Sequence, residues 1–174
     1  MRKLLFILLV MPFGLFAQNY TASVEVTGKD AATLYNKAKE WFAESFTTPG
    51  VVPPTEEAAK GILTGRESVK SMIYSNDVAL NITTSFIFKI SVKEGQYKYD
   101  IDNIMVERGP KYPLSSFKSG MTREGTLEIY KAAGMKTPTK KTIETNVDYS
   151  VKIVNKVEGE LNRLINSLAE KMMN

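Results

Sequence analysis

The most regular pattern in the chain is an alternation of apolar and polar positions from Leu80 to Lys93. Alternation over this length predicts a long β-strand with one buried face. The "KEGQ" that follows predicts a tight turn in which Gly95 takes a positive φ. A second alternating stretch comes after the turn, so the pattern predicts a β-hairpin. The positions expected on its buried face are Leu80, Ile82, Thr84, Phe86, Phe88, Ile90, Val92, Tyr97, Tyr99 and Ile101.

The alternation slips by one residue in the second strand of this hairpin. After Asn103 the apolar positions are Ile104 and Val106, which are out of phase with Ile101. One extra residue in a strand produces such a slip, so we expect a β-bulge near Asp102 and Asn103.

Two stretches show helical spacing instead. The first runs from Ala31 to about Phe46 and follows "TGKD", in which Thr27 and Asp30 resemble a capping box. The second runs from about Thr145 to Met172, and Gly159 within it is a candidate bend. The apolar stripes are Ala31, Leu34, Tyr35, Ala38, Trp41, Phe42 and Phe46, then Val147, Val151, Val154, Val157, Leu161, Leu164, Ile165, Leu168 and Met172.

The remaining segments have weaker patterns. Strands are expected at residues 20–26 and over "GILTGRESVKSMIY", with a loop at "TTPGVVPP" and a helical turn at "EEAAK". Residues 107–142 are turn-rich, with a short strand or helical turn around 127–133. A stretch this long without structure is unusual in a compact domain, so it is a packed surface loop, a mobile arm or an element that the pattern does not reveal.

These elements predict an α+β fold. We expect an antiparallel sheet of four or five strands with both helices packed on one face, because two apolar stripes need one apolar sheet face. The other face would be polar and open. The residues expected on the open face include Asn81, Thr83, Ser85, Lys89, Lys98 and Asp100.

The first residues, "RKLLFILLVMPFGLFAQN", are typical of a secretory signal peptide. Arg2 and Lys3 precede an apolar run that is short for a membrane span, and Ala17 suits the cleavage site. The alternatives are an N-terminal core helix or an uncleaved anchor. Cleavage would leave residues 18–174 as a single domain in the periplasm or outside the cell, without stable membrane insertion.

Composition narrows the chemistry. The chain has no cysteine, which excludes disulfides, thiolate metal sites and lipid attachment at a cysteine. It has no histidine, which excludes Ser-His-Asp catalysis. Loss of Arg2 and Lys3 with the signal peptide lowers the net charge from +4 to +2. A net charge of +2 does not favour nucleic-acid binding.

Two constellations could carry catalysis or bind a metal. In "SSFKSG", Ser115 precedes Lys118 by three residues, as in penicillin-recognising enzymes, but the second lysine motif overlaps the first and shares Lys118. Asp100 and Asp102 share one strand face and could form a carboxylate pair. Solvated charge is the simpler interpretation of that pair. We therefore assign no catalytic, cofactor-binding or metal-binding residue and expect no cofactor.

Aromatic residues are candidates for ligand stacking. Trp41 is the single tryptophan and lies on a helical apolar stripe, so a core position is favoured over a stacking platform. Exposed tyrosines would suit sugar or protein binding, but Tyr97 and Tyr99 are in phase with the buried face. The other tyrosines considered are Tyr112, Tyr130 and Tyr149.

The order of elements resembles a family of exported bacterial proteins. The likeness is carried by Trp41 and Phe42 at the end of "LYNKAKEWF", by "AKGILTGRES" and by "VKEGQYKY", and it is weakest over residues 107–142. The sequence is similar to a domain-of-unknown-function family of Gram-negative bacteria with a TATA-binding-protein-like (TBP-like) fold. The resemblance implies a β-α-β(4)-α arrangement. It implies no activity and no site residues, and the fold label does not itself imply DNA binding.

The expected function is a non-enzymatic exported module. It would bind a protein or glycan of the cell envelope through the open sheet face. The alternative is a small hydrolase of envelope polymers that uses carboxylates or a Ser-Lys pair.

Overall fold

The computed structural model describes residues 20–46, 55–75 and 78–174. The predicted signal peptide and the loop at "TTPGVVPP" lie outside the described residues. The described residues form one sheet and four α-helices, with a 3-10 turn, η1 (Ala58–Lys60), at the predicted "EEAAK" turn. Among them no helix is long and apolar enough to cross a membrane.

The sheet has six strands in the order β1-β5-β4-β3-β2, and β6 pairs with the last part of β5. Every pairing is antiparallel. The prediction of four or five strands was wrong because β2 and β6 are three residues long, too short for an alternating pattern. The strands are β1 (Tyr20–Glu25), β2 (Thr55–Glu57), β3 (Ile62–Ser75), β4 (Val78–Lys93), β5 (Gln96–Glu107) and β6 (Lys111–Pro113).

The predicted hairpin is confirmed as β4 and β5. Gly95 in its turn has a φ of 66°, as the sequence required. The register between the strands shifts between Ser85 and Ile87, which pair with Met105 and Asp102. Asn103 lies between these partners and has a φ of 48°, so the bulge is where the slip in alternation placed it.

The first helix, α1 (Ala31–Ser45), begins at a different cap from the one expected. The Asp30 side chain accepts a hydrogen bond from the backbone N–H of Thr33, and Asp30 is the N-cap. The capping-box interpretation with Thr27 was wrong. Gly28 takes a φ of 83° and redirects the chain, so helical dihedral angles begin only beyond it.

The last helix, α4 (Lys140–Met173), begins five residues earlier than expected, after the N-cap Thr139. Its first turn is polar except for Ile143, so the apolar stripe gave no signal there. Residues 107–142 also contain two more helices, α2 (Leu114–Ser119) and α3 (Arg123–Ala132). Of the alternatives left open for this region, the structure has elements that the pattern revealed only in part. The helical turn expected around 127–133 lies within α3, whereas α2 has six residues and was not predicted.

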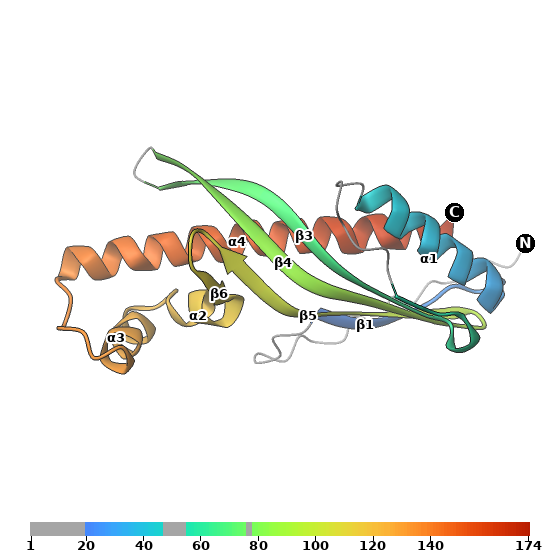
Figure 1. The fold of residues 1–174 in the computed structure, drawn as a ribbon, viewed down its shortest axis with the longest axis horizontal. Helices are drawn as coiled ribbons and strands as arrows, with labels where there is room; N and C mark the ends of the chain where they lie inside the picture. Colours follow the sequence, from blue (N-terminus) through green and yellow to red (C-terminus); the bar gives the residue numbers. More distant parts are fainter. Residues whose placement is uncertain (1–19, 47–54, 76–77) are drawn as a thin grey trace, which may run out of the picture.

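Helices α1 and α4 pack on the same face of the sheet, as predicted (Figure 1). Trp41 is 2% exposed, and its ring centroid lies 4.9 Å from that of Phe88 in β4. The Trp41 Nε1–H donates to Ser167 Oγ of α4 at 2.9 Å. Trp41 is therefore a core anchor that joins both helices to the sheet.

Gly65 allows this close approach of α1. A Cβ atom built on Gly65 would lie 2.7 Å from Phe42 Cε1 and 2.8 Å from Glu67 Oε1. Both neighbours are buried, so little space exists for them to move. The glycine is required here by packing.

Two glycine substitutions test this packing in opposite directions. Gly65→Ala is expected to lower the free energy of unfolding by about 1–3 kcal/mol, because the added methyl group overlaps the Phe42 ring. Gly159→Ala is expected to raise it by about 0.5–1 kcal/mol, since Gly159 is exposed within α4 and its Cβ would contact nothing within 4 Å. Urea unfolding followed by Trp41 fluorescence measures both, and shifts of the same sign would contradict the account.

Candidate functional site

The second face of the sheet carries no packed helix among the described residues and is called the open face below. Residues opposite one another in the register share a face, so the outward residues of β1, β3, β4 and β5 can be assigned directly. All six residues that the sequence placed on this face are there, and Asn81, Lys89 and Lys98 are exposed. The polar open face is therefore confirmed.

Charge is divided unevenly across this face. The outward charged residues of β3 and β4 are basic, whereas β5 carries outward carboxylates and Lys98. Lys89 of β4 lies directly opposite Asp100 of β5. The face therefore presents a basic region beside a region of mixed charge. The outward charged residues of β3, β4 and β5 are Arg66, Lys70, Lys89, Lys93, Lys98, Asp100, Asp102 and Glu107, and the shorter strands add Glu25, Glu57 and Lys111.

Apolar side chains are exposed at the far end of the β3–β4 hairpin. On the outward face, Met72 is 46% exposed and Tyr74 is 63% exposed, and Val78 nearby is also exposed. Figure 1 shows this hairpin extending past the other strands. Exposed large apolar groups beside charged ones are typical of a protein-binding surface.

The carboxylates Asp100 and Asp102 do lie on one face, as predicted. Asp100 Oδ1 accepts a hydrogen bond from Thr21 Oγ1 of β1 at 2.7 Å. Asp102 Oδ1 is buried without a hydrogen-bond partner among the described residues, next to the bulge. The described part of the chain contains no group of three or more Asp, Glu, His or Cys residues placed to hold a metal ion.

The Ser115–Lys118 pair lies on α2, where the lysine makes other contacts. Lys118 Nζ forms an ion pair with Glu158 Oε1 of α4 at 2.9 Å and lies 5.5 Å from the centre of the Tyr20 ring. The Tyr20 hydroxyl also donates to Glu158. The Lys118 ammonium is thus paired with a carboxylate of α4, and no structural contact joins it to Ser115 among the hydrogen bonds described.

Among the tyrosines considered above, Tyr97 and Tyr99 lie on the core-facing side of the sheet, as the sequence indicated. Tyr97 is fully buried and Tyr99 half-buried, which confirms that both cover the core. Tyr112 is exposed beside the Phe117 ring, and Tyr149 packs against Phe117 from the other side. Arg108 stacks over the Tyr149 ring at 5.7 Å, and the Tyr130 hydroxyl accepts a hydrogen bond from Asn146.

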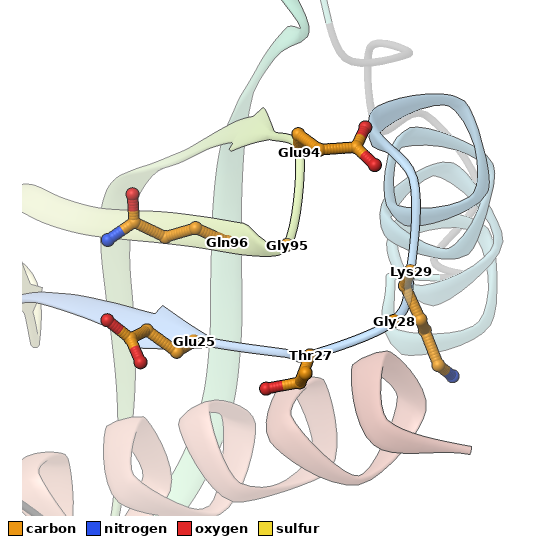
Figure 2. Close-up of a pocket in the computed structure, with 7 residues that line it drawn as sticks. All are labelled: Glu25, Thr27, Gly28, Lys29, Glu94, Gly95 and Gln96. Carbon is orange, nitrogen blue, oxygen red and sulfur yellow. The ribbon is translucent and has the colours of Figure 1, made fainter.

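A shallow hollow of about 380 Å³ lies where the β1–α1 loop meets the β4–β5 turn. Figure 2 shows Glu94 directed towards the start of α1, where its Oε2 accepts from the Ala31 N–H at 3.2 Å. Lys29 is directed away from Glu94, and its Nζ donates to the Met173 carbonyl of α4 at 2.8 Å. These polar groups therefore hold the loop, the turn and the C-terminal helix together. A second hollow, of about 340 Å³, lies between α3 and α4.

Sequence reasoning missed one unusual residue, Glu67. It lies on the core-facing side of β3, opposite Phe86, and is 4% exposed. Its Oε2 has no hydrogen-bond partner among the described residues. Burial raises the pKa of the Glu67 carboxyl to about 7. The signal was present, because Glu67 is in phase with the apolar Leu63 and Val69.

The fold, with its sheet, its helices on one face and its open second face, is that of a TBP-like α+β domain. The chain belongs to the family described as a domain of unknown function (DUF4468) with TBP-like fold, whose model matches residues 20–107. This match confirms the family resemblance. The match ends with β5, so β6 and the helices α2, α3 and α4 lie beyond it.

Solved structures share the fold over most of the chain. A TBP-like protein from Parabacteroides distasonis ATCC 8503 is 12% identical, with a TM-score of 0.55 over 87% of this chain and 92% of that one. A DUF4468 family protein from Bacteroides ovatus ATCC 8483 is 13% identical, with a TM-score of 0.55 over 86% of this chain and 85% of that one. No curated protein matches the chain. At this identity the structural likeness concerns the fold alone.

The burial of Glu67 predicts a pH dependence of stability. The carboxyl has a pKa of about 7 in the folded chain and 4.5 as its ordinary value, so the folded state binds the proton more tightly. Its contribution is therefore greatest below about pH 4.5, falls between pH 4.5 and 7, and is constant above. Glu67→Gln is expected to remove this fall, which is roughly 3 kcal/mol.

Urea unfolding of the two proteins between pH 5 and 8 measures this effect. The difference between Glu67→Gln and the parent cancels the titration of other groups. Glu107→Gln, at an exposed position on β5 of the same sheet, is the matched control and should follow the parent. If the unfolding free energies of Glu67→Gln and the parent changed in parallel with pH, the carboxyl would not be buried in its acid form.

Proposed function

We propose that this chain is an exported, non-enzymatic module that binds a protein partner through the open face of β3, β4 and β5. The observation that carries the proposal is the placement of α1 and α4 on one face, which leaves the other face as a broad surface of charged and polar side chains. Export is supported by the charge, apolar core and cleavage residue of positions 1–17.

A protein partner is favoured over a glycan by the character of the face. Its centre carries Lys89, Lys98 and Asp100, and its exposed apolar groups, Met72 and Tyr74, lie at the hairpin tip. Sugar sites instead place an aromatic ring among amide and carboxylate groups within a concave surface. The basic region over β3 and β4 suits acidic groups on the partner, so binding should weaken as salt increases.

The contacts of the candidate catalytic groups support a non-enzymatic function over the alternative hydrolase. Lys118 is ion-paired with Glu158, and Asp100 is hydrogen-bonded to Thr21. Glu67 has the raised pKa that a general acid needs, but it lies in the core beneath aromatic rings of α1. Glu67 lines neither of the two hollows described above.

The test compares two charge-reversed proteins with the parent. Residues 18–174 are immobilised and incubated with envelope extract of the source organism, and retained proteins are identified at low and high salt. Lys89→Glu with Lys98→Glu reverses two exposed charges on the open face. Lys136→Glu with Lys141→Glu makes the same change in charge at exposed positions near the start of α4 and is the matched control.

The expected result is a saturable protein partner that is retained by the parent and the control but at least tenfold less by the open-face variant. Equal retention by both variants would show that the open face is not the binding surface. If no protein were retained and envelope glycans were captured or cleaved, the proposal would be overturned. Export is checked separately by mass spectrometry, since cleavage after Ala17 makes Gln18 the first residue.

A further inference from the structure

One long strand of the sheet, β3, has an outer edge that is mostly unpaired among the described residues. β3 has fourteen residues, but β2 pairs only with Ile62, Leu63 and Thr64. Within the described ranges, no strand pairs with the outer edge of β3 from Gly65 to Ser75. Figure 1 shows this part of β3 at the border of the sheet. Alternate residues of such an edge direct backbone N–H and C=O groups outward, and these can pair with another strand.

We propose that this edge of β3 pairs with the same edge of a second copy of the chain, antiparallel and centred on Val69. The pairing joins the two sheets into one continuous sheet about a two-fold axis, so each favourable contact occurs twice. This inference concerns the edge of the sheet and does not depend on the partner proposed for its open face.

The register about Val69 is self-complementary on the core-facing side. It places Val69 opposite the second copy's Val69, and Gly65 opposite the second copy's Ile73. It also places Glu67 opposite the second copy's Ser71. Glu67 Oε2 is buried and lacks a hydrogen-bond partner among the described residues. The Ser71 hydroxyl of the second copy lies on the same side of the joined sheet and can donate to it.

The register is also compatible with the charges on the outward side. Arg66 falls opposite the second copy's Met72, and Ser68 falls opposite the second copy's Lys70, so no two like charges are directly opposed. Met72, which is 46% exposed in the single chain, is covered by the Arg66 side chain. Arg66 and Lys70 remain diagonal neighbours across the interface, and moderate salt should therefore strengthen the pairing.

A second copy is favoured over an unrelated strand for two reasons. The complementary residues are all present within nine consecutive positions of β3. The basic residues Arg66 and Lys70, which commonly protect sheet edges from pairing, are placed where the two-fold register avoids direct repulsion. An acidic peptide from another protein is the competing occupant, and it predicts a chain that stays monomeric when pure.

Sedimentation equilibrium of the purified chain, residues 18–174, tests the proposal with the protein alone. We expect a monomer–dimer equilibrium that salt shifts towards the dimer. Ser68→Glu should lower the dissociation constant about fivefold, because two new Glu–Lys pairs form across the interface. Ser68→Lys should raise it by about the same factor, because Lys then faces Lys70 of the second copy. Ser68 is exposed, so neither change disturbs the core.

A cysteine variant tests the register, since the chain has no cysteine of its own. Val69→Cys should form an intermolecular disulfide on mild oxidation, because the two Val69 residues are directly opposed. Ser23→Cys, at an exposed position of β1 near the opposite edge of the sheet, is the matched control and should remain reduced. A monomer at about 0.5 mM, a dimer that responds to neither Ser68 variant, or cross-linking of Ser23→Cys as rapid as that of Val69→Cys would overturn the proposal.

Discussion

The packing of α1 against Phe88 of β4 is the contact on which the rest of the structure depends. Trp41 and Phe42 contact the Phe88 ring at centroid distances of 4.9 and 6.0 Å. Gly65 removes the side chain that would keep α1 away from β3, and Trp41 also binds Ser167 of α4. Because one cluster holds both helices, both lie on one face of the sheet. The open face follows from that arrangement.

The fold contains two polar anomalies, and the packing of α1 explains the first of them. Glu67 follows Gly65 along the core-facing side of β3, so the close approach of α1 leaves its carboxyl without water and raises its pKa. Asp102 is buried at one oxygen because the bulge at Asn103 turns the β5 backbone beside it. The first anomaly lies on β3, whose outer edge beyond Thr64 has no partner strand among the described residues, and an added strand could supply the missing donor.

The long periodic segments could be predicted from the sequence because their pattern reports a single buried face. The β4–β5 hairpin, its bulge and the core position of Trp41 all followed from periodicity. The family resemblance and the TBP-like α+β fold are confirmed. The short elements β2, β6 and α2 could not be predicted, since three to six residues do not establish a period. Of the strand or helical turn expected around 127–133, the structure has helix, and its first turn was not predicted because Thr126, the buried residue of α3, is polar.

The candidate surfaces were predictable only in part. The polar positions that alternate along β4 and β5 identified the open face, because this alternation can be seen within each strand by itself. The order β1-β5-β4-β3-β2 is a property of the whole fold, so the alternation of β3 could not reveal that its edge lacks a long neighbour. Glu67 was overlooked although it is in phase with the core, because a strand pattern does not show which side of it a helix covers.

The most direct test of the account is the stability of Phe88→Ala. Phe88 is fully buried and contacts both Trp41 and Phe42. If this cluster holds the helices to the sheet, the variant should lose about 3–5 kcal/mol of unfolding free energy in urea, and Trp41 fluorescence and circular dichroism should report one shared transition. A loss below about 1 kcal/mol for so large a truncation would contradict it. Separate transitions for the two signals would show that α1 is held independently of the sheet.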